Sequence, residues 1–425
     1  MRRTRIPHRA RRTALEQLAV RLRRSRHTLR RSRTLLDRHR GLFRTLRLLL
    51  LAAAATVFTI AAWPAVRAHL QAVAILKILG GQPVPWVVGH TLATPITTED
   101  TSFSIPSADG QAQTVRARLY LPVGLPHAPA VVVLHGVHHL GIDEPRLEAF
   151  AAALANCGIR VLTPELPDIK DYHIDASSIQ TIGESAQWFA RQTGGPVGVV
   201  GLSFSGGLAL IAAARPAYEP AFRFVFAVGS QDSMDRVTEY YRTGRDPRPN
   251  GSVEVLPPHE YGPLVLEYEY VEDFVPAHDV PAIRSVLRAH LYEDKTAEKS
   301  MMQTLRAAQR AEAVSLMDTA SEPTQALIVA SNEKHAHELA GLSPHGVLET
   351  LTVPVYLLHG EADNIIPSAE TQWMATELPR STLKAVLVSP VISHIDFESS
   401  EPTALDRARL IHFFALVMQA AERKR

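Results

Sequence analysis

The chain has 425 residues, of which 46% are hydrophobic, and a formal net charge of +2. This length and apolar content exclude a disordered or fibrous chain and are ample for a large packed core. The single cysteine, Cys157, excludes an internal disulfide, and we expect it to be a structural residue.

The first 47 residues are strongly basic. They hold 17 arginines against two acidic residues, a net charge of +15, which leaves −13 on the rest of the chain. Leu48–Val66 follows as a run of 19 residues without a charge, and Arg67 ends it. As a helix, this run is long enough to cross a bilayer core of about 30 Å. The basic flank predicts a cytoplasmic N-terminus and an extracytoplasmic remainder of the chain.

Two other interpretations of this segment remain open, a cleaved signal peptide and a buried core helix. The apolar run exceeds the roughly 7 to 15 residues of a signal peptide, and the basic flank is longer than a signal needs. We therefore expect a single-pass protein of the cytoplasmic membrane. The tail is expected to fix topology, with contact to anionic headgroups or nucleic acid as the alternative, and no nucleic-acid partner is expected.

After the apolar run, residues 68–100 are rich in glycine, proline and threonine and are expected to form a linker. Beyond it, short β-branched runs alternate with helical patterns, which predicts an α/β fold with a mostly parallel sheet covered by helices. The expected strands are Thr114–Pro122, Ala130–Gly136, Ile159–Leu166, Val197–Gly201, Phe222–Gly229, Val353–Gly360 and Leu383–Pro390, and the expected helices are Pro145–Asn156, Ser177–Gln192, Leu208–Ala214, Ser368–Glu377 and Pro402–Ala421.

The alternation stops for about 120 residues after Phe222–Gly229. Only Pro263–Val271 resembles a strand there, and Ser300–Met317 has an amphipathic helical pattern. An insertion of this length is more typical of an ordered helical cap than of a loop. Its tyrosines either pack on the core or line an acyl pocket. The expected divisions are 1–47 basic tail, 48–67 transmembrane helix, 68–100 linker, 101–234 first part of the core, 235–352 cap and 353–425 second part of the core.

One stretch, VGVVGLSFSGGLAL, has the strand, turn and helix of a nucleophile elbow, in which a serine on a strained turn needs small neighbours. With Ser203 as nucleophile, the crowded neighbours are Gly201, Ser205 and Gly206. With Ser205 they include the bulky Leu208, so Ser203 is favoured and Ser205 is the alternative. A phosphate-binding loop is disfavoured because its lysine is absent.

A serine hydroxyl becomes a nucleophile when a histidine removes its proton and a carboxylate orients that histidine. Asp363 and His394 each follow one of the last two expected strands, at the sheet edge where such folds present functional groups. Together with Ser203 they give the chain order Ser, Asp, His. The less favoured acids are Glu361 and Asp396.

With LHGVHH, GLSFSGG, HGEADNIIP and SHIDF in this order, the chain from about residue 104 to 421 resembles a serine hydrolase of the α/β-hydrolase fold, esterase-like or lipase-like. The resemblance implies a triad of Ser203, Asp363 and His394. It also implies an oxyanion hole made by the Val137 and Phe204 amides. The residues expected to support these groups are His135, Gly136, Gly201, Ser205 and Gly206.

The resemblance implies hydrolysis of a carboxylic ester through an acyl-enzyme, with no cofactor and no metal. From the expected anchor alone, we expect the substrate to be a small-molecule or lipid ester at the outer face of the membrane. His135, His138, His139 and Asp143 are residue types that bind zinc, but we expect packing and pocket roles for the histidines. Ser205 stands where the family more often has glycine, and the cap matches no known lid. The alternatives are an acyltransferase, a peptidase or lactonase, and a non-catalytic receptor or scaffold.

Overall fold

The computed structural model describes residues 46–106, 112–392 and 402–422, and of residues 90–92 only the backbone. Contacts divide the chain into two units, Met1–Val66 and Arg67–Arg425.

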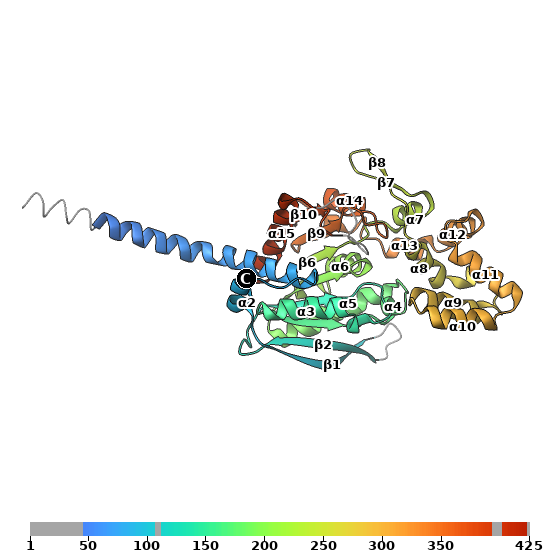
Figure 1. The fold of residues 1–425 in the computed structure, drawn as a ribbon, viewed down its shortest axis with the longest axis horizontal. Coiled ribbons are helices and arrows are strands. Elements are labelled where there is room, and N and C mark those ends of the chain that lie inside the picture. Colours follow the sequence, from blue (N-terminus) through green and yellow to red (C-terminus); the bar gives the residue numbers. More distant parts are fainter. Residues whose placement is uncertain (1–45, 107–111, 393–401, 423–425) are drawn as a thin grey trace, which may run out of the picture. The chain divides into compact units, whose positions relative to one another are not determined.

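An eight-stranded sheet forms the centre of the second unit (Figure 1). The strand order is β1-β2-β4-β3-β5-β6-β9-β10. β2 pairs antiparallel with β1 and with β4, and all other neighbours in the sheet are parallel. The predicted fold, a mostly parallel sheet flanked by helices, is confirmed. The strands are β1 (Ile96–Pro106), β2 (Ala112–Pro122), β3 (Ala130–Leu134), β4 (Arg160–Pro164), β5 (Val197–Leu202), β6 (Phe222–Val228), β9 (Val355–Gly360) and β10 (Leu383–Ser389).

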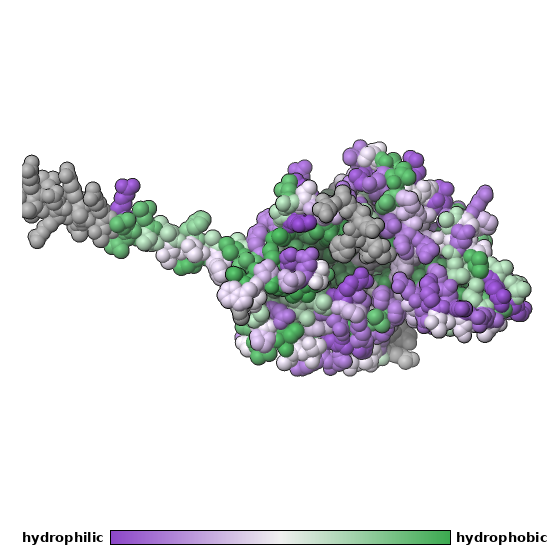
Figure 2. Space-filling model, viewed as in Figure 1, coloured by the Kyte–Doolittle hydropathy of each residue, from purple (hydrophilic) through white to green (hydrophobic). Residues whose placement is uncertain are grey.

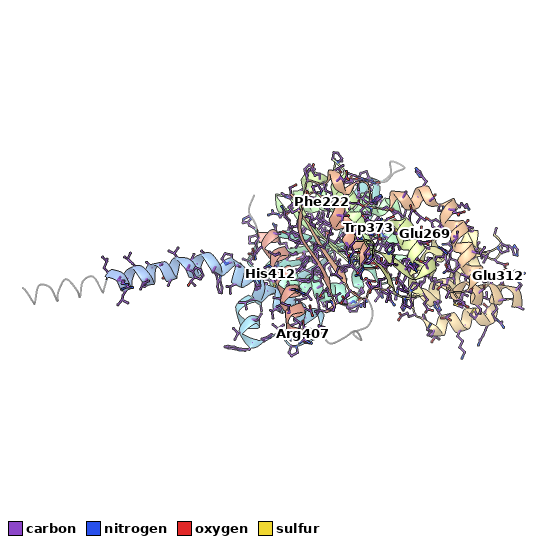
Figure 3. All side chains as sticks on the ribbon, turned by 90° about the horizontal axis from the view of Figure 1, so that it is seen from above. Phe222, Glu269, Glu312, Trp373, Arg407 and His412 are labelled. Carbon is purple, nitrogen blue, oxygen red and sulfur yellow. The ribbon has the colours of Figure 1, made fainter. Side chains whose placement is uncertain are left out.

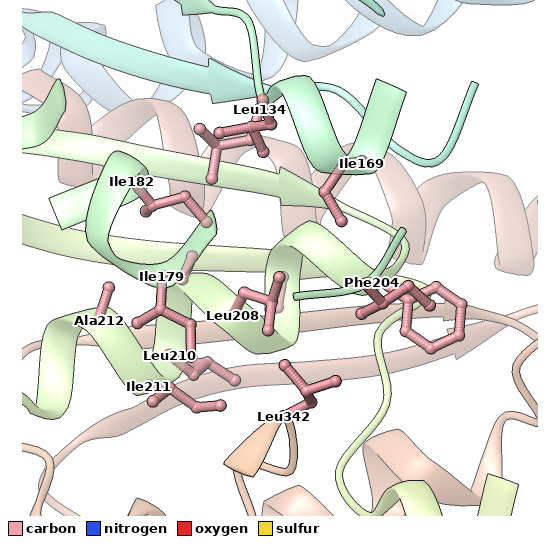
Figure 4. Packing of buried hydrophobic residues seen from close by; sticks show 14 of the residues in the cluster. Leu134, Ile169, Ile179, Ile182, Phe204, Leu208, Leu210, Ile211, Ala212 and Leu342 are labelled. Carbon is pink, nitrogen blue, oxygen red and sulfur yellow. The ribbon is translucent and has the colours of Figure 1, made fainter. Parts of the chain in front are cut away.

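Helices cover both faces of the sheet because its strands are apolar on both sides. In β3, Val131 and Val133 pack with α3 and α15, whereas Val132 and Leu134 pack with α5 and α6 (Figure 4). This alternation follows from the two-residue period of a strand. The core helices are α2 (Trp86–Leu92), α3 (Pro145–Asn156), α4 (Pro167–Lys170), α5 (Ala176–Thr193), α6 (Phe204–Ala214), α14 (Ala369–Glu377) and α15 (Ala404–Glu422).

The residues between β6 and β9 form a mainly helical cap with one small hairpin. In Figure 1 the cap helices α8 to α12 gather beyond the carboxyl ends of the parallel strands, and α2 lies toward their amino ends. The cap elements are α7 (Met234–Thr243), β7 (Arg245–Pro247), β8 (Val253–Val255), α8 (Tyr261–Glu269), α9 (Val280–Leu291), α10 (Lys295–Thr304), α11 (Ala307–Met317), α12 (Glu322–Lys334) and α13 (Ala336–Gly341).

The strand-like run Pro263–Val271 is helical, and that expectation was wrong. Gly262 through Tyr268 are all buried. A helix surrounded by other helices is apolar on every side, and a short apolar run of this kind has no period that separates helix from strand.

The segment expected as a linker, residues 68–100, is largely structured. It contains the end of an N-terminal helix, Leu46–Leu79, together with α2 and the start of β1. From this helix, Ala68, Ala72 and Ile75 join the core cluster of α3 and α15. Their spacing of four and three residues places them on one helical face.

This helix end is attached at the amino edge of the sheet. The Gln71 Nε2 donates to the Cys157 carbonyl at 3.0 Å, just before β4 begins. Arg67 lies 3.5 Å from Glu422, at the end of α15. His69 stacks on His412, labelled in Figure 3, with ring centroids 5.3 Å apart. The chain therefore enters the second unit at the edge of the sheet where the parallel strands begin.

Leu46–Leu79 is long and apolar enough to cross a membrane, with a mean hydropathy of 2.0 in its most apolar window. None of that window is buried, whereas a core helix would be mostly covered. Figure 2 shows apolar side chains exposed along this part of the chain. A membrane anchor and a signal sequence are both consistent with such a helix.

Candidate active site

Ser203 lies at the tip of a sharp turn between β5 and α6. Its φ of 57° and ψ of −137° place it in a region that residues other than glycine rarely adopt. Such a conformation costs about 1 to 3 kcal/mol and persists only where the surroundings impose it. The Ser203 amide donates to the Val228 carbonyl at 2.8 Å, and the Gly206 amide donates to the Ser203 carbonyl at 3.0 Å. These bonds hold the strained turn.

The neighbours of Ser203 are small because backbone fills the space around them. A Cβ on Gly201 would lie 2.4 Å from the Gly206 Cα. A Cβ on Gly206 would lie 2.1 Å from the Ser230 Oγ and 2.8 Å from the Gly201 carbonyl. Neither position accepts a side chain without backbone movement, as expected for a nucleophile elbow.

The second serine of the stretch is engaged with the turn itself. Ser205 is buried, and its Oγ donates to the Leu202 carbonyl at 2.7 Å and accepts from the Leu202 amide at 3.0 Å. Ser203 remains partly exposed. The geometry therefore favours Ser203 over Ser205 as the nucleophile.

The loop after β3, residues 135–139, lies against the elbow and is called the oxyanion loop below. A Cβ on Gly136 would be 3.4 Å from the Ser203 Cβ, so glycine allows this close approach. The His135 Nδ1 bonds the Gly136 carbonyl at 2.8 Å, and its Nε2 accepts from the Leu166 amide at 2.9 Å. Because a carbonyl only accepts and an amide only donates, the ring is neutral with its proton on Nδ1.

Burial reinforces this state of His135. Removal from water lowers the pKa of its imidazole from 6.5 to about 4. Neutral His135 is therefore a fixed structural support under the oxyanion loop at neutral pH.

The predicted acid, Asp363, is buried in the loop after β9, at the same carboxyl edge as Ser203. Its Oδ1 accepts from the Ile365 and Ile366 amides, both at 3.0 Å. Its Oδ2 lies 3.4 Å from the Nε2 of His359, whose ring is itself held by Ile366 and Thr371. The fallback Glu361 is exposed. Burial and fixed orientation thus favour Asp363 as the acid.

The predicted base, His394, lies outside the described residues, as do the less favoured acid Asp396 and residues 1–45 of the basic tail 1–47. β10, which precedes His394 in the chain, is the neighbour of β9 in the sheet. The order of strands therefore agrees with the chain order Ser, Asp, His.

The loop after β6 contributes residues that the sequence analysis did not identify. The Ser230 Oγ donates to the Ser203 carbonyl at 2.9 Å. Behind it, buried Glu370 accepts from the Asp232 and Ser233 amides and from the Arg236 side chain, at 2.7 to 2.8 Å. This ion-paired network fixes the loop against the back of the elbow. Its members are far apart in sequence, so no local signal reveals them.

Two of the four groups considered for zinc, His135 and Asp143, are engaged with protein partners. Both ring nitrogens of His135 bond to backbone, and Asp143 pairs with Arg116 and Arg118. His139 stacks between His138 and Tyr292, with ring centroids 4.6 and 4.4 Å apart. Of the two histidines after Gly136, His139 therefore packs on the cap residue Tyr292, and His138 packs on His139.

No protein-family profile matches the chain, and no curated protein matches its sequence. A candidate hydrolase from Legionella pneumophila superposes with a TM-score of 0.51 and 12% identity, over 82% of this chain and 95% of that one. A candidate lipase from Acinetobacter baumannii gives 0.39 and 14%, over 76% and 92%. Brefeldin A esterase, a bacterial homologue of human hormone-sensitive lipase, gives 0.40 and 16%, over 81% and 82%.

Topology and the first of these similarities agree on the architecture. The chain has the α/β-hydrolase fold, with a mostly parallel sheet, flanking helices and a long apolar helix near the N-terminus.

Proposed function

We propose that the protein is a serine hydrolase that cleaves carboxylic esters through an acyl-enzyme. In this mechanism His394 takes the proton of Ser203 as the Oγ attacks the acyl carbonyl, and Asp363 holds the imidazole. The Val137 and Phe204 amides stabilise the oxyanion of the tetrahedral intermediate. The alcohol leaves with the proton from His394, and water activated by the same histidine releases the acid.

The observation that carries this proposal is the strained backbone of Ser203. A serine with φ of 57° is maintained by tight glycine contacts and two backbone hydrogen bonds, beside a glycine of the oxyanion loop. Strain of this kind is expected where a side chain must be presented for chemistry. The amide of Phe204 supports the same role because the first amides of a helix have no partner within it.

We further propose that the apolar run Leu48–Val66 of the N-terminal helix anchors the chain in the cytoplasmic membrane, with a cytoplasmic N-terminus and the hydrolase unit outside. The hydrolase unit is entered through Arg67 at the amino edge of the sheet, whereas Ser203 lies at the carboxyl edge. β5 has six residues, so the two edges are about 20 Å apart. Within the hydrolase unit, the candidate site therefore lies at the opposite edge of the sheet from the point where the chain enters.

An acyltransferase is the second candidate, since an alcohol in place of water would resolve the same acyl-enzyme. Product analysis with an added alcohol separates them: ester products identify transfer, and free acid alone identifies hydrolysis.

The proposal is tested by labelling the purified full chain in detergent with a fluorophosphonate probe. We expect labelling of the wild type and of Ser205→Ala, and none of Ser203→Ala. Ser205→Ala is the matched control because it removes a hydroxyl two residues away. Absence of labelling in a folded wild type would overturn the hydrolase mechanism and favour a receptor or scaffold.

A further inference from the structure

A single side-chain hydrogen bond links the cap to the oxyanion loop among the described residues. The hydroxyl of Tyr261, at the start of α8, donates to the Val137 carbonyl at 2.7 Å. The two residues are 124 positions apart in the chain. This contact joins the proposed oxyanion donor to an element outside the core.

This bond fixes the peptide group that follows Val137, while a core residue fixes the peptide group that precedes it. His135 holds the Gly136 carbonyl. In a planar trans peptide the Val137 N–H points away from that carbonyl, so His135 sets the direction of the N–H. Tyr261 holds the carbonyl of the next peptide. Both peptide planes that meet at Val137 are thus fixed, one from the core and one from the cap.

The same short segment of the cap also contacts the loop of the proposed acid. The His259 amide donates to the Asn364 carbonyl at 2.8 Å, next to Asp363. The Tyr261 amide in turn donates to the His259 Nδ1 at 3.2 Å. Residues 259–261 therefore bridge the loop after β9 and the loop after β3.

The ring of Tyr261 is itself held by aromatic contacts. It meets the Tyr172 ring edge-on, with centroids 5.9 Å apart. Tyr172 has a φ of 64° and donates its hydroxyl to the Leu291 carbonyl in α9 at 3.0 Å. Burial raises the pKa of Tyr261 well above 10, so its hydroxyl stays protonated and remains a donor.

We propose that Tyr261 is a positioning residue that holds the oxyanion loop with the Val137 amide directed at the reacting carbonyl. The inference rests on the proposed function of Ser203. Because Tyr261 belongs to the cap, the oxyanion hole is then fully positioned only when the cap contacts the oxyanion loop. The Val137 amide stabilises the charge that develops on the carbonyl oxygen in the transition state. Loss of the Tyr261 hydrogen bond should therefore weaken transition-state stabilisation more than substrate binding.

The test is Tyr261→Phe in the full chain, which removes the hydroxyl and keeps the ring against Tyr172. The matched control is Tyr268→Phe in the same helix. The Tyr268 hydroxyl accepts from the Arg288 Nε at 2.7 Å and donates to the Asp171 Oδ1 at 3.5 Å, so the control also loses partly buried hydrogen bonds, but away from the oxyanion loop. Turnover of p-nitrophenyl butyrate and inhibition by an aryl trifluoromethyl ketone, which forms an oxyanion on the nucleophile, are measured for all three proteins.

We expect Tyr261→Phe to lower kcat about 5- to 10-fold and to change KM by no more than about twofold. This is the effect expected when one hydrogen bond that stabilises the transition state is lost. The inhibition constant of the ketone should rise by the same factor. Tyr268→Phe should leave kcat and the inhibition constant unchanged. A merely structural role would lower the unfolding temperature of both variants without the split between kcat and KM.

Equal kcat and equal ketone inhibition in Tyr261→Phe and wild type would overturn the inference. This outcome is distinguishable from failure of the proposed function, in which the wild type neither turns over the ester nor reacts with a fluorophosphonate.

Discussion

The turn that follows β5, at the carboxyl edge of the sheet, is crowded and strained, whereas the turn that precedes β5, at the amino edge, is open. Where β5 ends, Ser203 has a φ of 57° and Gly201 has no room for a Cβ. Before β5 begins, Gly195 has nothing within 4 Å of a Cβ. The strained edge carries the candidate chemistry and contacts the cap, whereas the relaxed edge receives the N-terminal helix. The strained backbone at this edge therefore indicates the position of the candidate active site better than the fold alone does.

The largest expected difference between the edges is in catalysis. Asp363→Asn should lower kcat by about 10³-fold or more, because an amide no longer stabilises a protonated His394. Ester hydrolysis at pH 7.5 measures it. Glu361→Gln, two residues earlier and exposed, should leave kcat unchanged. A large loss in Glu361→Gln with activity retained in Asp363→Asn would reverse the assignment of the acid.

Two glycines, one near the end of β5 and one before its start, give the next contrast. Gly201→Ala should destabilise the protein by more than about 3 kcal/mol, because its Cβ would lie 2.4 Å from backbone that cannot move aside. Gly195→Ala should change stability by less than about 0.5 kcal/mol. Thermal and urea unfolding of the two variants compare them. Equal stabilities would show that the carboxyl edge is not strained as described.

A pH effect is expected at the carboxyl edge from His135. Its pKa is 6.5 in the unfolded chain and about 4 when folded, so the unfolded chain binds more protons between these values. The stabilising contribution, about 3 kcal/mol, is complete above pH 6.5 and is lost as the pH falls to 4. Urea unfolding from pH 7 to 4 should therefore show a steeper decline for the wild type than for His135→Gln. Parallel curves would contradict a buried neutral His135.

The smallest effect is expected at the amino edge. Gln71→Leu leaves the Cys157 carbonyl without its side-chain donor, and should lower the free energy of unfolding by about 1 kcal/mol. Because Gln71 lies at the edge opposite Ser203, kcat and KM should be unchanged. A drop in kcat without a change in stability would mean that the two edges are coupled.

Local patterns were enough to predict most of the core. The strand Ala130–Leu134 is a continuous apolar run, and Val355–Gly360 begins with four apolar residues. The elbow around Ser203 concentrates its small residues within six positions. Asp363 followed from its place after a strand. These features depend on neighbours in sequence, where periodicity and steric demand can be read directly.

Long-range contacts were not predictable in the same way. Tyr261 meets Val137 across 124 residues, and Glu370 meets Asp232 across 138. Neither pair has a motif. The packing of Ala68 and Ile75 against the core could have been recognised, because small and apolar residues continue at helical spacing after Arg67. The composition of residues 68–100 as a whole concealed that signal.

The most direct measurement is the capture of an acyl-enzyme. The full chain is mixed with p-nitrophenyl acetate, quenched in acid within the first turnover, digested and examined by peptide mass spectrometry. The account predicts one acetyl group per molecule, located on Ser203, and none after His394→Ala. Acetyl groups on Ser205, or spread over surface lysines with no modification of Ser203, would contradict the assignment of the strained carboxyl edge as a catalytic site.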